Sequence, residues 1–153
     1  SDSLTNIEGI KGSTTASNTL IGNNMNNTLI GGNQTDTIKG VSGNNSLSGG
    51  AGDDTIFAGT GSDIIDGGAG NDIINVANMS DLTSADIITD TSGIDTLNIN
   101  GNGTIASSDF NVSGFENLNL SNSADVVTFT DKSSFDTFKS KFSSAGDTKG
   151  GDD

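Results

Sequence analysis

Aliphatic side chains recur at every ninth position between residues 13 and 75. A frame of seven uninterrupted nine-residue units starts at Ser13, and its eighth positions are Leu20, Leu29, Ile38, Leu47, Ile56, Ile65 and Ile74. The sixth position of every unit is an amide or a carboxylate: Asn18, Asn27, Asp36, Asn45, Asp54, Asp63 and Asp72. A fixed short period of this kind indicates a repeat architecture.

Each unit predicts a six-residue turn followed by a three-residue strand whose middle side chain points inward. The glycine content of the turns disfavours a helix, and glycine permits positive φ and close backbone approach. Two units then form one 18-residue coil, with turns alternating between two sides of a flattened stack. The pattern therefore predicts an all-β fold, a parallel β-solenoid with a core of stacked Leu and Ile.

Composition makes such a core thin, because only 30% of the 153 residues are hydrophobic and the net charge is −14. Low hydrophobicity with high charge is typical of chains that do not fold unaided. The absence of Cys and His removes disulfides, thiolate chemistry and imidazole ligands. The acidic balance disfavours nucleic acid and anionic membranes as partners, and no apolar run is long enough for direct membrane insertion. A hard cation with oxygen ligands is the expected partner.

The units GGAGDDTIF, AGTGSDIID and GGAGNDIIN, residues 49–75, resemble the nonapeptide of RTX (hemolysin-type calcium-binding) repeats. The resemblance is close over residues 13–75 and looser over 76–100. It implies a right-handed β-roll in which calcium ions lie in rows between successive turns of one side. It also implies that the ligands are sixth-position carboxylates and carbonyl groups of the glycine-rich turns, here those of Gly50, Gly52, Gly59, Gly61, Gly68 and Gly70.

Turns of the same side are 18 residues apart, which pairs the candidate carboxylates. The spacing predicts sites at Asp36/Asp54, Asp54/Asp72, Asp72/Asp90 and Asp63/Asp81, with a weaker one at Asn45/Asp63. About four to five calcium ions are expected. Because Asn offers an oxygen without charge, the turns before residue 49 either bind calcium weakly or remain metal-free and form amide ladders.

The segment from Ser84 to Gly101 resembles the one that commonly follows RTX arrays, on the basis of Asp86, Asp90, Gly93 and Asp95. Asp90 is the preferred ligand of this group. Asp86 and Asp95 are interpreted either as further ligands or as solvated turn residues.

Four segments are predicted along the chain: a lead-in or cap over 1–12, the β-roll over 13–75, an irregular solenoid continuation over 76–130, and a helix with a tail over 131–153. Within the last segment, Phe135, Phe138 and Phe142 share one face at helical spacing. This helix is expected to cover the end of the solenoid, and an alternative is part of a C-terminal secretion signal. The glycine-rich tail favours a fragment of a longer array.

The sequence therefore predicts a structural calcium-binding module, not an enzyme, because its aspartates form a periodic row instead of a convergent pair. Calcium binding would supply the folding free energy that the thin core lacks. We expect a secreted, extracellular protein of the bacterial cell surface, of the S-layer or adhesin type, capable of self-association. The alternative is the repeat and type I secretion domain of an RTX toxin or hydrolase.

Overall fold

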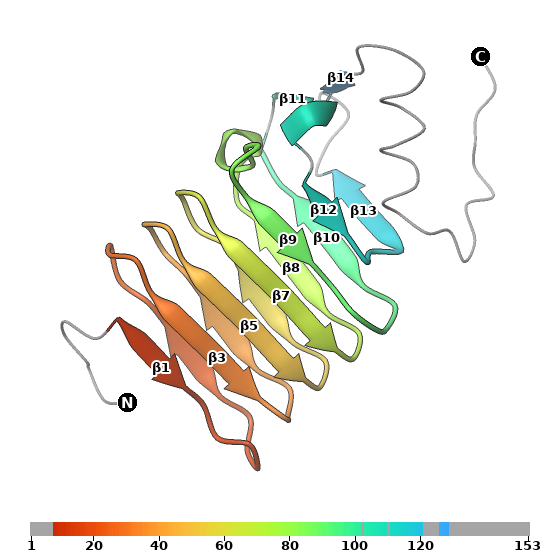
Figure 1. Ribbon diagram of the computed structural model, residues 1–153. Helices are drawn as coiled ribbons and strands as arrows, with labels where there is room; N and C mark the ends of the chain where they lie inside the picture. The colour runs from red at the N-terminus through yellow and green to blue at the C-terminus, as the bar shows by residue number, and fades with distance from the viewer. Residues whose placement is uncertain (1–7, 102, 110, 121–125, 129–153) are drawn as a thin grey trace.

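The computed structural model describes residues 8–101, 103–109, 111–120 and 126–128, and the described chain forms a β-solenoid of two facing parallel sheets (Figure 1). Strands alternate between the two sheets along the sequence up to residue 99, so each coil contributes one strand to each sheet. This confirms the predicted all-β parallel solenoid.

The first sheet has six strands in the order β1-β3-β5-β7-β9-β12. Their bounds are Gly9–Lys11, Thr28–Gly32, Ser46–Ala51, Ile64–Ala69, Ile87–Thr89 and Val112–Ser113. The second sheet has the order β13-β10-β8-β6-β4-β2. In chain order these strands, β2 to β13, span Thr19–Ile21, Thr37–Lys39, Thr55–Phe57, Ile73–Val76, Thr96–Ile99 and Asn117–Leu120.

Two more strands, β11 and β14, pair with each other, and two short 3-10 helices, η1 and η2, interrupt the coils. Their bounds are Thr104–Ala106 for β11, Val126–Thr128 for β14, Met79–Asp81 for η1 and Ser107–Asp109 for η2. The helix predicted around residues 133–144 lies outside the described residues. No helix in the part of the chain that the structure describes is long and apolar enough to cross a membrane.

The strands follow the alternation in the sequence, with the eighth position of each unit inside and its neighbours outside. β2 shows the pattern in three residues, because Leu20 is buried while Thr19 and Ile21 are exposed. The β-branched residues that flank the buried position suit a pleated surface. Stacked eighth-position side chains then form one continuous core, which Val76, Met79, Leu82 and Phe115 extend beyond the repeats.

Neighbouring strands are offset by 18 residues through the repeats, as Ile38↔Ile56 and Ile56↔Ile74 show. The offset then becomes 23 residues, with Ile65 paired to Ile88 and Ile74 to Leu97. The five additional residues lie in the connection between β8 and β9, which contains η1. This longer connection is accommodated because Met79 and Leu82 are buried in the core.

Candidate metal centre on one edge of the solenoid

The solenoid has two edges, formed by turns that run in opposite directions between the sheets (Figure 1). Turns 31–36, 49–54, 67–72 and 90–95 lead from the first sheet to the second, and we call them the carboxylate edge. Turns 22–27, 40–45, 58–63 and 76–86 lead back to the first sheet, and we call them the amide edge.

Successive turns of the carboxylate edge are joined by hydrogen bonds from backbone N–H groups to carboxylates. Asp36 N donates to Asp54 Oδ1 at 2.7 Å, and Asp54 N donates to Asp72 Oδ1 at 2.7 Å. Asp72 N continues the row by donating to Asp95 Oδ1 at 2.8 Å. One oxygen of each carboxylate is thereby occupied, and the side chain is held against the neighbouring turn.

The second oxygen of these carboxylates is buried without a hydrogen-bond partner. Among the described residues, the buried oxygens without partners are Oδ2 of Asp36, Asp54, Asp72, Asp90 and Asp95, together with Oδ1 of Asp66. The five Oδ2 atoms belong to side chains of the carboxylate edge that are at most 8% exposed. A buried charged oxygen without a partner is costly, so this row requires protons or a cation.

First-position glycines lie directly against these oxygens. A Cβ atom built on Gly49 would collide with both Asp54 Oδ2 and the carbonyl oxygen of Gly67. A Cβ atom on Gly31 would similarly meet Asp36 Oδ2 and the carbonyl oxygen of Gly49. Each glycine therefore borders a space in which a carboxylate of its own turn and a carbonyl of the next turn converge.

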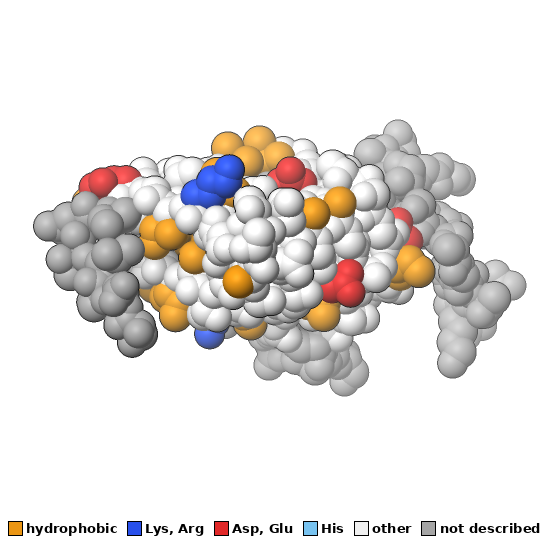
Figure 2. Space-filling view, turned by 90° about the horizontal axis from the view of Figure 1, so that it is seen from below, with side chains coloured by type: hydrophobic (Ala, Val, Ile, Leu, Met, Phe, Trp, Pro, Cys, Tyr) orange, Lys and Arg blue, Asp and Glu red, His pale blue; other side chains and the backbone are white. Residues whose placement is uncertain are grey.

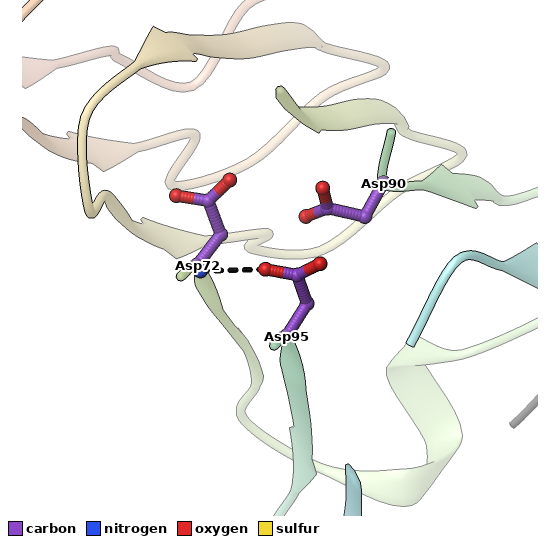
Figure 3. Close-up of side chains that lie close together, drawn as sticks. All are labelled: Asp72, Asp90 and Asp95. Carbon is purple, nitrogen blue, oxygen red and sulfur yellow. Dashed lines mark hydrogen bonds between the residues drawn. The ribbon is translucent and has the colours of Figure 1, made fainter. Parts of the chain in front are cut away.

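At the third space, three carboxylates meet. One oxygen from each of Asp72, Asp90 and Asp95 lies within 4.8 Å of the others. Figure 3 shows the three side chains pointing toward one another, with the hydrogen bond from Asp72 N to Asp95. Asp90 takes the first position of its turn, where the preceding turn has Gly67, and its Oδ2 occupies the space beside that glycine.

Burial raises the pKa of these carboxyl groups. The pKa of Asp54 rises to about 7 and that of Asp90 to about 8, in both cases mainly because burial disfavours the charged form. Neighbouring carboxylates add to the effect, Asp72 and Asp36 on Asp54, and Asp95 and Asp72 on Asp90. Burial likewise raises the pKa of Asp72 and Asp95. Like charges along the row therefore disfavour simultaneous ionisation of neighbouring carboxyl groups.

These donors fit calcium. Calcium binds six to eight oxygen ligands from carboxylates, backbone carbonyls and water, and each space offers carboxylate oxygens, with glycine carbonyls at the first two. The residues that would hold the ion are Asp36, Asp54, Asp72, Asp90 and Asp95.

One of the pairings predicted from the 18-residue spacing is wrong. Asp63 stacks against Asp86 instead of Asp81, because its backbone N donates to Asp86 Oδ1 at 2.7 Å. Asp81 lies in η1 and accepts a hydrogen bond from Asn78 Nδ2 at 2.8 Å. The longer connection between β8 and β9 shifts the register by five residues, which a fixed period does not anticipate.

The same shift changes how Asp72 meets Asp90. The residue stacked on Asp72 is Asp95, and Asp90 approaches from the start of the same turn as Asp95. Asp86 and Asp95 are 3% and 1% exposed, so their interpretation as solvated turn residues is wrong as well. Asn45 and Asp63 do stack as predicted, with Asn45 N donating to Asp63 Oδ1 at 2.8 Å.

The glycines named as carbonyl donors have another evident role. Positive φ angles, between 95° and 134°, occur at Gly50, Gly52, Gly59, Gly61, Gly68 and Gly70. These second- and fourth-position glycines permit the turn to form. The carbonyl groups beside the unpartnered carboxylate oxygens are those of Gly49 and Gly67, which the sequence analysis did not single out. Glycine recurs at the first position of these turns, and that recurrence could have identified Gly49 and Gly67 from the sequence.

Glu116 also joins the carboxylate edge without having been predicted. Its Oε2 accepts a hydrogen bond of 2.8 Å from Asp95 N, in the coil after the last aspartate turn. The preceding links in the row use Asp residues at 18- or 23-residue spacing, whereas Glu116 follows at 21 residues. No regular spacing would have revealed it.

Comparison with known proteins agrees with this geometry. The family model for the RTX calcium-binding nonapeptide repeat, which comprises four copies, matches residues 13–47 and 39–74. No curated protein and no solved structure matches the chain. The matched residues include the turns of Asp36, Asp54 and Asp72, whereas Asp90 and Asp95 lie beyond them. Residues 13–74 of this chain are therefore RTX calcium-binding nonapeptide repeats.

Proposed function

We propose that this chain is a calcium-folded structural module of a secreted bacterial cell-surface protein, of the S-layer or adhesin type. RTX repeats are calcium-binding structural modules, and the proposal concerns where and when this one folds. The observation that carries it is the row of buried carboxylate oxygens without partners on the carboxylate edge.

Two opposing contributions to the free energy decide whether the repeats fold. The repeats supply a core only one side chain wide on each sheet, and like-charged carboxylates are stacked along its edge. Calcium would neutralise this row, and its binding free energy then becomes folding free energy. Extracellular modules bind calcium with Kd values of about 0.1–1 mM. Such a chain would remain unfolded at the low calcium of the cytoplasm and fold after export.

A role in surface assembly draws on exposed apolar side chains of the strands. Ile21, Phe57 and Ile73 are exposed on the second sheet by 55%, 39% and 40%, and Ile30 and Ile64 on the first by 37% and 54%. On the face that Figure 2 shows, hydrophobic side chains are separated by polar groups and backbone, and acidic side chains occupy only small areas. We propose that these side chains make lateral contacts once calcium has folded the module.

Direct binding tests the proposal. Equilibrium dialysis with radioactive calcium should show saturable binding that a similar concentration of magnesium does not displace, because magnesium demands a stricter octahedral geometry and releases water reluctantly. Absence of binding at 10 mM calcium would disprove the proposed function. Light scattering with and without calcium then tests assembly, and export of a fused reporter by this segment alone would favour the secretion-domain alternative.

A further inference from the structure

The two edges of the solenoid differ at the first position of their turns. On the carboxylate edge this position is Gly31, Gly49, Gly67 and then Asp90. On the amide edge it is glycine only in the first two turns, and Ala58 and Val76 follow. Ala58 and Val76 are 5% and 1% exposed and belong to the hydrophobic core. In the last two turns of the amide edge, apolar side chains thus occupy the position that glycine holds in the first three turns of the carboxylate edge.

The sixth position also differs between the edges. Asn45 Nδ2 donates to the carbonyl oxygen of Gly43 at 2.9 Å and to Asp63 Oδ1 at 3.1 Å. A Cβ atom built on Gly40 would lie 2.9 Å from this nitrogen. Beside Gly49, the corresponding neighbour is an unpartnered carboxylate oxygen. A hydrogen-bond donor in that place repels a cation.

Asp86 on the amide edge has both carboxylate oxygens occupied. Its Oδ1 accepts from Asp63 N, and its Oδ2 accepts from Thr83 N at 2.7 Å and from Thr83 Oγ1 at 3.0 Å. None of the buried oxygens without partners in the described residues belongs to Asp63 or Asp86. At Asn45 and Asp86 the amide edge is therefore closed by its own hydrogen bonds. Beside Gly22, Asn27 Oδ1 accepts a hydrogen bond of 2.8 Å from Asn23 N.

The first turn of the carboxylate row is closed in the same way. Asn18 Nδ2 donates to the carbonyl oxygens of Ser13 and Ala16 and to Asp36 Oδ1, at 3.0, 2.9 and 2.8 Å. Its amide nitrogen lies where later turns have a free carboxylate oxygen. The spaces bordered by carboxylate oxygens without partners consequently lie beside Gly31, Gly49 and Gly67.

We propose that calcium loads the carboxylate edge alone, with three ions, one at each of these spaces, and none on the amide edge. The first would use Asp36, the second Asp54, and the third Asp72, Asp90 and Asp95. This count is lower than the four to five ions that spacing alone suggests. The inference rests on the proposed calcium binding and adds its position and number.

The test compares matched substitutions at the same repeat position on the two edges. The number of bound calcium ions is measured by equilibrium dialysis on the full chain and on D36N, D54N and D63N variants. The wild type is expected to bind three ions, D36N and D54N to lose at least one each, and D63N to keep three. D36N places in the row the same amide that Asn18 has one turn earlier, so we expect the variant to fold.

Each outcome bears on a different statement. Loss of an ion in D63N, or more than three ions in the wild type, would overturn loading on a single edge. Fewer than three ions in the wild type, or an unchanged count in folded D36N, would overturn the assigned spaces. No calcium binding by the wild type would instead contradict the proposed function itself.

Discussion

The backbone N–H of Asp72 donates a 2.8 Å hydrogen bond to Oδ1 of Asp95, which lies 23 residues further along the chain. Earlier links in the same row span 18 residues, as between Asp54 and Asp72. The carboxylate row therefore continues across the end of the regular repeats, although the sequence period does not. The third candidate calcium site depends on this continuation.

The register shift predicts different effects for substitutions at Asp95 and at Asp81. Asp95→Asn should weaken the third site and raise the calcium Kd by about tenfold or more, which corresponds to about 1.4 kcal/mol. Asp81→Asn should leave the Kd unchanged, because Asp81 lies in η1 and contacts Asn78. Isothermal titration calorimetry measures both. Weaker calcium binding by the Asp81 variant would contradict the register shift and support the pairing of Asp63 with Asp81.

Filling the space beside a first-position glycine should remove calcium binding there. Gly49→Ala would place a methyl group against Asp54 Oδ2 and the Gly67 carbonyl oxygen, so we expect loss of one ion and a less stable calcium-bound fold. Gly9→Ala is the control, because a Cβ atom there would be 3.8 Å from its nearest neighbour, an ordinary contact. Unchanged calcium binding in Gly49→Ala would contradict the assignment.

Two adjacent residues of β7 should differ strongly in their contribution to stability. Ile65 is fully buried, so Ile65→Ala should lower the free energy of unfolding of the calcium-bound chain by about 2–5 kcal/mol. Ile64 is 54% exposed, and Ile64→Ala should change it by less than about 0.5 kcal/mol. Urea denaturation in saturating calcium measures both. Equal losses would show that the strand does not have the alternation described.

Stability of the calcium-free fold should decrease as pH rises. In the folded chain the pKa values of Asp54 and Asp90 are about 7 and about 8, against an ordinary value of 3.8. The folded state then holds more protons than the unfolded state between these values, so its stability is fully present below about pH 4 and is lost toward pH 8. Calcium must displace these protons, and its affinity should therefore increase over the same range.

Circular dichroism of the chain in EDTA, without denaturant, at pH 5 and pH 8 tests this dependence through the folded fraction. Asp90→Asn should reduce the difference in folding between pH 5 and pH 8, because one group that gains a proton on folding has been removed. Greater stability at pH 8 than at pH 5 would be incompatible with buried carboxyl groups of raised pKa.

The sequence predicted the repeats well because one period controls both packing and hydrogen bonding there. Every ninth residue from Leu20 to Ile74 is inward-facing, and the sixth-position residues form the two predicted rows. In a stacked solenoid each coil copies its neighbour, so a fixed spacing in the sequence becomes a fixed register in the sheets.

Prediction failed where the chain leaves that period. The longer connection between β8 and β9 is stabilised by burial of Met79 and Leu82, and nothing in their spacing distinguishes them from residues of an ordinary coil. The difference between the edges was also hidden, because Asp54 and Asp63 occupy the same position of the repeat. Only contacts across turns show that Asp54 has an unpartnered oxygen while Asn45 donates to Asp63.

A calcium titration of the EDTA-treated chain, followed by circular dichroism and hydrodynamic radius together, tests calcium-coupled folding most directly. We predict a largely unfolded, expanded chain in EDTA that becomes compact and β-rich near millimolar calcium. A chain that is already compact and β-rich in EDTA at pH 8, and unchanged by calcium, would contradict the central claim.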